Sequence, residues 1–359
     1  MTSNTEAGEI WVLGAAGRIG RAVAARLAAQ GFTLVLAGRS KDSLAKVAAD
    51  LGSQAEVVVT TSVDDIADQV ARRRPAVVVN TIGNYAETAT VIARAGMPGG
   101  HYVDLAADLV SLPRLFALHE DAVAAGSTLV TGAGFGVLAT EAVVAKLCEG
   151  RPTPSRVQVD PLASVASDGG VVGAAYAASI VDIVTMGGRR YENGQLVTSR
   201  LGADPQRLTL PDGETVKSAG APSGELMAAH RISGAPSVTV TTALAPTSPL
   251  VRAVLPAVGK LLSISSLRRF AVRRMAGATM KPAPRPRRHS WGHAVVTWAD
   301  GTSREGWLRA DEGMDYTAAV AAETAARLAR GEARPGAYTP AAALGPELAV
   351  AAGGTFLLD

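Results

Sequence analysis

Three glycines, Gly14, Gly17 and Gly20, follow a short apolar run at regular spacing. The run Ile10–Leu13 is expected to be a strand, and Arg18–Gln30 a helix, because apolar residues recur in it every four positions. A strand that enters such a turn and then a helix is typical of a site for the pyrophosphate of a dinucleotide. The glycines permit a tight turn and close approach of backbone N–H groups, and the helix N-terminus adds partial positive charge. The alternative is a glycine-rich turn that binds nothing.

We predict cofactor contacts along this whole loop, at Gly14, Ala15, Ala16, Gly17, Arg18, Ile19 and Gly20. The choice between NAD and NADP depends on the end of the second strand, where an NAD site usually has Asp or Glu for the ribose 2′-hydroxyl. Here the sequence has Arg39 and Ser40. A guanidinium can stack on adenine and pair with a 2′-phosphate, and the hydroxyl can add a hydrogen bond, so NADP is predicted. The alternative is that Arg39 is only a solvated residue at the start of a helix.

Further cofactor contacts follow from the geometry of parallel sheets, in which ligands lie beyond the carboxyl ends of the strands. Residues 61–63 are expected to flank the adenine, and residues 81–85 to pass the ribose and nicotinamide. The predicted contacts there are Ser62, Val63, Thr81, Ile82 and Gly83.

A nicotinamide transfers hydride, so the protein must supply positioning, exclusion of water and a proton source. Asp104 and Tyr102 are candidates because they end a predicted strand near the cofactor, and Tyr85 follows another. Tyr176 lies on a glycine- and alanine-rich helix of the second half and is expected to face the cofactor. For each of these residues the alternative is a packing or capping role.

These residues need a scaffold, and the first 130 residues provide one by alternating strands and helices. The strands are apolar on both faces, which is typical of a parallel sheet covered on both sides. The predicted fold class is therefore α/β, a Rossmann-type doubly wound parallel sheet. The pattern changes after a Pro-rich linker at residues 151–154, and Asp300-Gly301 predicts a tight hairpin between two later strands. A second, mixed α+β substrate domain is expected there.

Composition excludes several other classes. Cys148 is the only cysteine, so no disulfide can form within the chain, and a cytoplasmic protein is expected. The N-terminal MTSNTEAGE lacks the pattern of a signal peptide, and no run of about 18 apolar residues predicts a membrane span. His289 and His293 are four residues apart, but Gly292 and the preceding Pro/Arg-rich loop argue against a helix. No metal site is predicted.

The stretch from Leu226 to Ala299 has no Asp or Glu, and ten Lys or Arg residues lie between positions 252 and 288. Residues 250–276 also place apolar side chains at helical spacing, namely Leu250, Val251, Val254, Leu255, Val258, Leu261 and Leu262. Such a segment can contact a membrane peripherally, or dock an acidic carrier protein or coenzyme A thioester. The alternative is a helix packed on its own domain with solvated arginines. No nucleic acid partner is expected, because aromatic residues are not interleaved with the charges.

The sequence resembles the saccharopine dehydrogenase-like NAD(P)-binding oxidoreductases over most of its length. The matching stretches are GAAGRIGRAVAARLAAQGFTLVLAGRS, VVVNTIGNYAETATVIARAG, HYVDLAAD, LVTGAGFGVLATE and GMDYTAAVAAETAARLARGEARPGAYTPAAALG. The glycine motif is shared with many Rossmann proteins, whereas its combination with N-x-x-G-x-Y, H-Y-V-D-L and Y-T-P-x-x-A-L-G is more specific. Residues 150–290 match loosely. The sequence has Gly83-Asn84-Tyr85 where the family often has Gly-Pro-aromatic, and Gly136 where the family often has Asp.

The resemblance implies a Rossmann domain at 1–134, a substrate and dimerisation domain at 135–334, and a C-terminal segment, 335–359, that returns to the first domain. It also implies a homodimer. The expected function is NADPH-dependent reduction of an imine (C=N) or a conjugated C=C in a small metabolite, free or tethered to a carrier protein or coenzyme A. The alternative is a non-redox nucleotide-binding protein, or a redox-neutral cyclase, that keeps the Rossmann fold.

Overall fold

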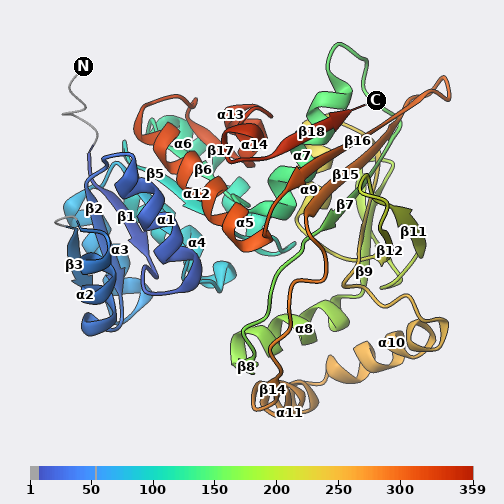
Figure 1. Cartoon of the computed structure of the whole chain (residues 1–359), viewed down its shortest axis with the longest axis horizontal. Coiled ribbons are helices and arrows are strands. Elements are labelled where there is room, and N and C mark those ends of the chain that lie inside the picture. Colours follow the sequence, from blue (N-terminus) through green and yellow to red (C-terminus); the bar gives the residue numbers. More distant parts are fainter. Residues whose placement is uncertain (1–7, 53–54, 359) are drawn as a thin grey trace. The chain divides into compact units, whose positions relative to one another are not determined.

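The computed structural model describes residues 8–52 and 55–358, except for the side chains of residues 175 and 176. The chain forms two compact units. The first combines Met1–Leu138 with Met314–Gly354, and the second combines Ala139–Gly313 with Thr355–Asp359. Each unit is built around its own sheet (Figure 1).

The first unit contains a seven-stranded parallel sheet in the order β17-β6-β5-β4-β1-β2-β3. Its strands are β1 (Ile10–Leu13), β2 (Leu34–Gly38), β3 (Glu56–Val59), β4 (Val77–Asn80), β5 (His101–Asp104), β6 (Thr128–Val130) and β17 (Gly336–Tyr338). From β1 the chain builds the sheet outward to β3, then crosses back to place β4 on the other side of β1. This reversal is the doubly wound topology, and it confirms the predicted fold class.

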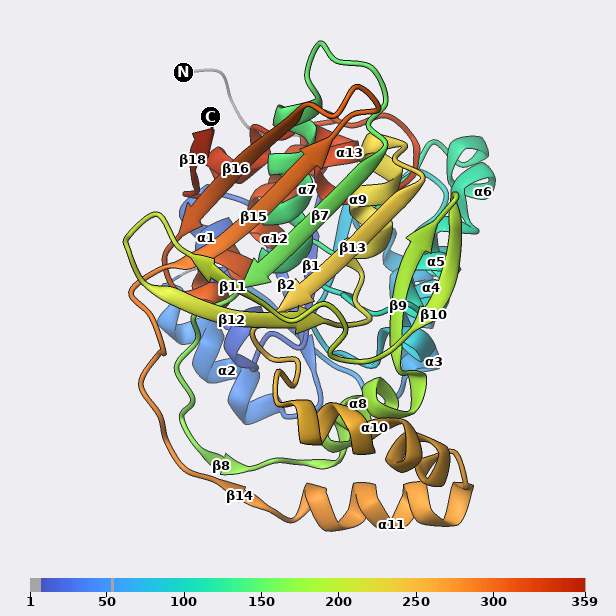
Figure 2. The same cartoon turned by 90° about the vertical axis from the view of Figure 1, so that its right-hand side faces the viewer.

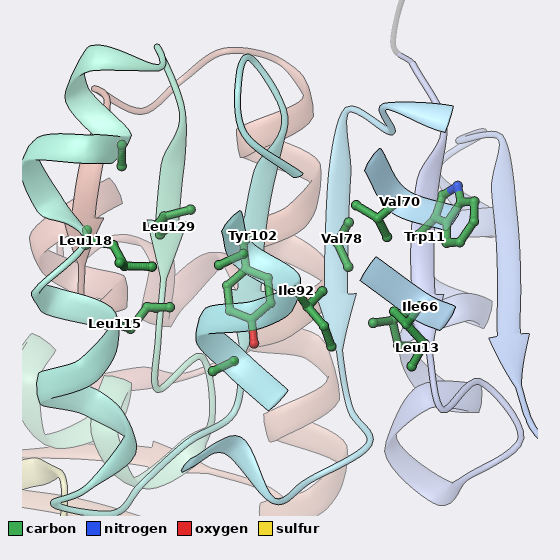
Figure 3. Packing of buried hydrophobic residues seen from close by; sticks show 14 of the residues in the cluster. Trp11, Leu13, Ile66, Val70, Val78, Ile92, Tyr102, Leu115, Leu118 and Leu129 are labelled. Atoms are coloured by element: carbon green, nitrogen blue, oxygen red, sulfur yellow. The ribbon is translucent and has the colours of Figure 1, made fainter. Parts of the chain in front are cut away.

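Both faces of this sheet are covered, and the apolar central strands β1 and β4 are buried on both sides by helices of the first unit. They are α1 (Arg18–Ala29), α2 (Lys41–Asp50), α3 (Val63–Arg73), α4 (Tyr85–Gly96), α5 (Ser111–Phe116), α6 (His119–Ala124), α12 (Gly313–Ala329), α13 (Pro340–Leu344) and α14 (Leu348–Ala351). α7 (Phe135–Cys148) runs from the first unit into the second. On one face, side chains of α3 to α6 pack on Trp11, Leu13, Val78, Tyr102 and Leu129 to form a continuous apolar core (Figure 3).

The second unit contains a mixed sheet in the order β10-β9-β13-β7-β15-β16-β18, with β11 and β12 attached beside β13. Its strands are β7 (Arg156–Leu162), β9 (Gly188–Glu192), β10 (Gln195–Ser199), β11 (Gln206–Thr209), β12 (Thr215–Gly220), β13 (Ser237–Thr242), β15 (Ser290–Thr297), β16 (Ser303–Ala310) and β18 (Thr355–Leu358). Only β13 and β7 pair in parallel within the described part of this sheet. The predicted turn at Asp300-Gly301 joins β15 to β16, and Gly301 has a φ of 84°.

Three further helices of the second unit lie together beyond one end of its sheet (Figure 2). They are α8 (Ala174–Met186), α10 (Pro249–Leu262) and α11 (Ser265–Ala276), and α8 contacts both of the others. Two short strands, β8 (Gly170–Val171) before α8 and β14 (Thr279–Met280) after α11, pair with each other. α9 (Glu225–Ser233) instead packs on β7, β9 and β13.

The C-terminal part of the chain is divided differently from the predicted 135–334 and 335–359. Helix α12, placed in the substrate domain by the sequence, belongs to the first unit, and β17 extends the parallel sheet beside β6. The last strand, β18, pairs with β16 in the second unit, although the whole segment was expected to return to the first domain. The two C-terminal strands pair with edges of different sheets, β17 with β6 and β18 with β16. Each pairing satisfies backbone N–H and C=O groups that an edge strand would otherwise leave unpaired.

Candidate functional site

A pocket of about 530 Å³ opens at the carboxyl ends of β1, β2 and β4, entirely within the first unit. The chain adds strands on one side of β1 up to β3 and on the other side from β4 onward, so the topological switch point lies between β1 and β4. Ligands of doubly wound sheets bind at this point. The volume suits part of a dinucleotide. The lining residues are Leu13, Gly14, Ala16, Gly17, Ala37, Gly38, Arg39, Ser40, Ser43, Thr60, Thr61, Ser62, Val63, Ile66, Thr81 and Ile82.

The three glycines of the loop have three different structural roles. Gly14 has a φ of 77°, and a Cβ there would lie 3.0 Å from Oγ1 of Thr81. Gly17 donates its N–H to the carbonyl of Gly14 at 2.8 Å and caps α1, so the helix N-terminus faces the pocket that Gly17 lines. A Cβ on Gly20 would lie 2.3 Å from the carbonyl oxygen of Gly14, so only glycine lets the helix pack this closely on the turn. The loop therefore fits a bound pyrophosphate.

At the end of β2 the pocket is lined by one cation and two hydroxyls. Arg39 is exposed there, Ser40 caps α2, and Oγ of Ser40 donates a hydrogen bond to Oγ of Ser43 at 2.9 Å. The backbone N–H of Ser43 donates to Oγ of Ser40 at 3.3 Å, which holds both hydroxyls at the start of the helix. No carboxylate lines the pocket in the described part of the chain. This set fits a 2′-phosphate and lacks the carboxylate that usually accepts the hydrogen bond of a ribose 2′-hydroxyl.

The side of the pocket that is predicted to flank the adenine is held by the cap of α3. Oγ of Ser62 accepts the N–H of Asp65 at 3.1 Å, and the Asp65 carboxylate accepts the N–H of Thr61 at 2.9 Å. This reciprocal capping fixes residues 60–63 beside the pocket, with Ile66 of the same helix as an apolar wall. On the other side, Oγ1 of Thr81 donates to the carbonyl of Leu13 at 2.7 Å and ties β4 to β1.

Asp104 ends β5 and is fully buried. Its Oδ1 accepts hydrogen bonds from the Thr131 hydroxyl at 2.7 Å, the Ala106 N–H at 3.0 Å and the Gly132 N–H at 3.3 Å. Burial raises the pKa of Asp104 to about 6, although these hydrogen bonds act in the opposite direction. The carboxyl group therefore joins the loops that follow β5 and β6, and it has no access to solvent.

The two tyrosines near Asp104 differ in accessibility. Tyr102 is buried in the apolar core (Figure 3), and burial followed by the charge of Asp104 raises the pKa of its hydroxyl. Tyr85 begins α4 and is half-buried. Burial, and then the charge of Asp104, raises the pKa of Tyr85 well above its usual range, despite a hydrogen bond with the backbone of Leu105. Tyr85 thus stays protonated at neutral pH, and of these three side chains it alone belongs to a residue that is not fully buried.

Comparison with known proteins finds a family model that matches most of the N-terminal part of the first unit. Residues 10–130 match the family model of the saccharopine dehydrogenase NADP binding domain. This segment is a saccharopine dehydrogenase-type NADP-binding domain. The match confirms the predicted cofactor and the family resemblance, and with the fold it indicates an NADP-dependent oxidoreductase.

Solved structures extend the similarity beyond the NADP-binding domain. Apo saccharopine dehydrogenase (L-Glu forming) from Saccharomyces cerevisiae matches with a TM-score of 0.62 and 14% sequence identity, over 98% of this chain and 100% of that chain. At this identity the similarity shows that the whole chain has the saccharopine dehydrogenase fold. Serine dehydrogenase from Escherichia coli matches 34% of this chain and 80% of its own, with 15% identity and a TM-score of 0.30, which is too low to support an argument. No curated protein matches the sequence.

The pocket of the NADP-binding domain includes most, but not all, of the predicted contacts. Gly14, Ala16, Gly17, Arg39, Ser40, Ser62, Val63, Thr81 and Ile82 line it. The others, which are not lining residues and stay predictions, are Ala15, Arg18, Ile19, Gly20 and Gly83. The sequence did not single out Ser43, Thr60 or Ile66. Ser43 could have been found from its position three residues after Ser40, the expected start of the helix.

The four proposed catalytic residues do not form one cluster in the described structure. Asp104, Tyr102 and Tyr85 lie together in the NADP-binding domain, as their mutual charge interactions show. Tyr176 belongs to α8 of the other unit, and its side chain lies outside the described residues. Its role stays a prediction.

Proposed function

We propose that this protein is an NADPH-dependent reductase that delivers hydride to an imine or conjugated C=C of a small metabolite, free or tethered to a carrier. The observation that carries the choice of NADPH is the acid-free end of β2, where Arg39, Ser40 and Ser43 line the pocket. When bound there, the nicotinamide supplies the hydride. The chain itself binds the phosphates, positions the cofactor and provides a proton.

Tyr85 is our candidate for the proton source. It follows the pocket residues Thr81 and Ile82 and is held beside the end of β5 by its hydrogen bond with the backbone of Leu105. The hydroxyl is protonated at neutral pH, so it can donate to a nitrogen or carbon that gains negative charge as hydride arrives. Asp104 and Tyr102 are buried, and we propose positioning roles for both.

The first test is a titration of the purified protein with NADPH and NADH, followed by nicotinamide fluorescence. We expect tight binding of NADPH and much weaker binding of NADH. A screen of cyclic imines, α,β-unsaturated acids and their thioesters should then reveal NADPH oxidation. Tight NADPH binding without turnover on any such compound would instead favour a non-redox role for the bound nucleotide. Failure to bind either nucleotide would remove the reductase proposal.

A further inference from the structure

Helices α10 and α11, with β14, expose an unusual amount of apolar surface. We call residues 249–280 the basic arm. Of the 21 large hydrophobic residues that are exposed in the described chain, nine lie in this arm: Leu250, Val251, Val254, Val258, Leu261, Ile264, Leu267, Phe270 and Met280. A concentration of this kind marks an interaction surface, whereas exposed apolar residues scattered singly do not.

Helix α10 has two apolar sides, and the second unit covers only one of them. Gly259 is buried, and a Cβ there would lie 2.7 Å from the carbonyl oxygen of Val184, so this side packs tightly on α8. Leu255 and Leu262 share that side and are half-buried. Because a helix turns by about 100° per residue, Leu250, Val254, Val258 and Leu261 fall on another side. Leu250 is 80% exposed, and Val254 and Leu261 are each 56% exposed.

Helix α11 contacts α10 and carries most of the exposed cations of the arm. Arg268 pairs with Asp182 of α8 at 2.6 Å, so it lies on the side of α11 that faces α8. Arg269, Arg273 and Arg274 are then exposed, together with Phe270, which is 59% exposed. A surface hollow of about 560 Å³ lies against the helix, lined by Arg268, Arg269, Val272 and Arg273. The exposed side of α11 is thus both cationic and apolar.

No acidic residue of the arm balances these charges. Residues 226–299 contain no Asp or Glu, and of the ten Lys or Arg residues between 252 and 288, six lie in the arm and four in the loop that follows it. Of these ten, Arg268 alone forms an ion pair within the described residues. The arm therefore presents a strong positive potential next to uncovered aliphatic and aromatic side chains.

Within the described residues, no single helix is long and apolar enough to span a membrane. α10 and α11 reach the required length and apolarity only as a pair, and they are bent by 114° at their junction. Two short helices at this angle do not make one straight span, but both can lie in the plane of a membrane interface.

We propose that the basic arm docks this protein on a membrane surface that contains anionic phospholipids. Leu250, Val254, Leu261 and Phe270 would enter the boundary between headgroups and acyl chains, and the exposed arginines of α11 would bind the lipid phosphates. The occupant is argued from charge: an anionic surface neutralises the arm, whereas a second copy of this chain would bring the same uncompensated cations together. The proposal is independent of the reductase activity.

The test is flotation of the full-length protein with vesicles of phosphatidylcholine alone, or of phosphatidylcholine with phosphatidylserine. We expect binding only to the anionic vesicles, and release as salt is added. The triple variant Arg269→Glu, Arg273→Glu and Arg274→Glu should reduce partitioning about 100-fold or more. A matched charge control changes three exposed cations outside the arm, Arg72→Glu, Arg207→Glu and Lys217→Glu, and should retain most of the binding.

A second variant tests the apolar contribution. Leu250→Ser, Val254→Ser and Leu261→Ser should lower partitioning about tenfold or more, while Val123→Ser with Val350→Ser, which are exposed elsewhere, should not. All these side chains are exposed, so we expect the variants to fold normally. Circular dichroism before flotation checks this. Equal binding to neutral and anionic vesicles, or equal losses in the arm and control variants, would overturn the proposal. So would a dimer that the arm variants dissociate, because the surface would then belong to a second copy.

Discussion

The hydroxyl of Tyr102 accepts a hydrogen bond from Nδ2 of Asn80 at 2.9 Å, inside the core of the NADP-binding domain. Oδ1 of Asn80 accepts the N–H of Ile82 at 3.1 Å, and Ile82 lines the cofactor pocket. Nδ2 also donates to Oγ1 of Thr88 at 3.2 Å. The buried tyrosine thus helps to hold the loop after β4 in place, and its hydroxyl acts on the pocket through Asn80.

Two matched substitutions can distinguish the positioning role proposed for Tyr102 from the proton-donor role proposed for Tyr85. Tyr85→Phe should lower the turnover number about 100-fold or more and leave the dissociation constant for NADPH unchanged, because it removes a proton donor. Tyr102→Phe should reduce stability by about 1 kcal/mol, because Asn80 loses a partner, with a much smaller effect on turnover. Steady-state kinetics and urea unfolding of both variants give the comparison. Equal losses of turnover would contradict the assignment of Tyr85.

The proposed site for the 2′-phosphate, at Arg39, Ser40 and Ser43, predicts a change in cofactor preference. Arg39→Ala should weaken NADPH binding about 10- to 100-fold and NADH binding little, because a charge-assisted contact is lost only with the phosphorylated cofactor. Ser43→Ala should cost about fivefold for NADPH alone. Lys46→Ala, on the exposed side of the same helix and outside the pocket lining, is the matched control. Titration with both nucleotides measures the ratio, and equal losses for NADPH and NADH would contradict the assignment.

The buried carboxyl of Asp104 predicts a pH dependence of stability. Its pKa in the folded protein is about 6, above the ordinary value of 3.8, so between these values the folded state binds more protons than the unfolded state. Stability should therefore fall as pH rises from about 4 to about 6, by about 3 kcal/mol in total from this group. Asp104→Asn retains an acceptor oxygen and cannot ionise. Urea unfolding at a series of pH values should show a smaller fall for the variant; parallel curves for the two proteins would contradict the assignment.

The sequence predicts the NADP-binding domain well because its signals are local. The glycine spacing, the apolar strands and the absence of acid at Arg39-Ser40 each depend on adjacent residues. Ser43 was missed because its position beside Ser40 depends on the first turn of α2. The division of the C-terminal segment was also missed, because pairing of β17 with β6 and of β18 with β16 joins residues about 50 to 200 positions apart.

In the basic arm, too, the sequence alone does not show which apolar residues remain exposed. Sequence spacing placed seven apolar residues of α10 on one side, from Leu250 to Leu262. The structure separates them, since Leu255 and Leu262 are half-buried while Leu250, Val254 and Leu261 are exposed. Periodicity identifies an apolar side, but tertiary packing decides how much of it remains uncovered.

The glycine loop offers the last prediction, in which two neighbouring substitutions have different consequences. Gly20→Ala would place a Cβ 2.3 Å from the Gly14 carbonyl oxygen and should destabilise the domain by about 1 to 3 kcal/mol. Gly17 has a φ of −76°, which alanine adopts, and a Cβ there would lie 3.2 Å from the Gly14 carbonyl oxygen, a close contact but a looser one than at Gly20. Gly17→Ala should therefore be destabilised less than Gly20→Ala, and it should lose NADPH affinity where the pyrophosphate must approach the backbone.

Gly96→Ala is the matched control, because its Cβ would meet only Val70 at an ordinary 3.8 Å, so stability and affinity should stay near those of the natural chain. Thermal unfolding and NADPH titration of the three variants separate the two effects. If Gly17→Ala bound NADPH as tightly as the Gly96 control, the loop would not be the pyrophosphate site, and the pocket lined by Arg39 would have to hold the cofactor in another way.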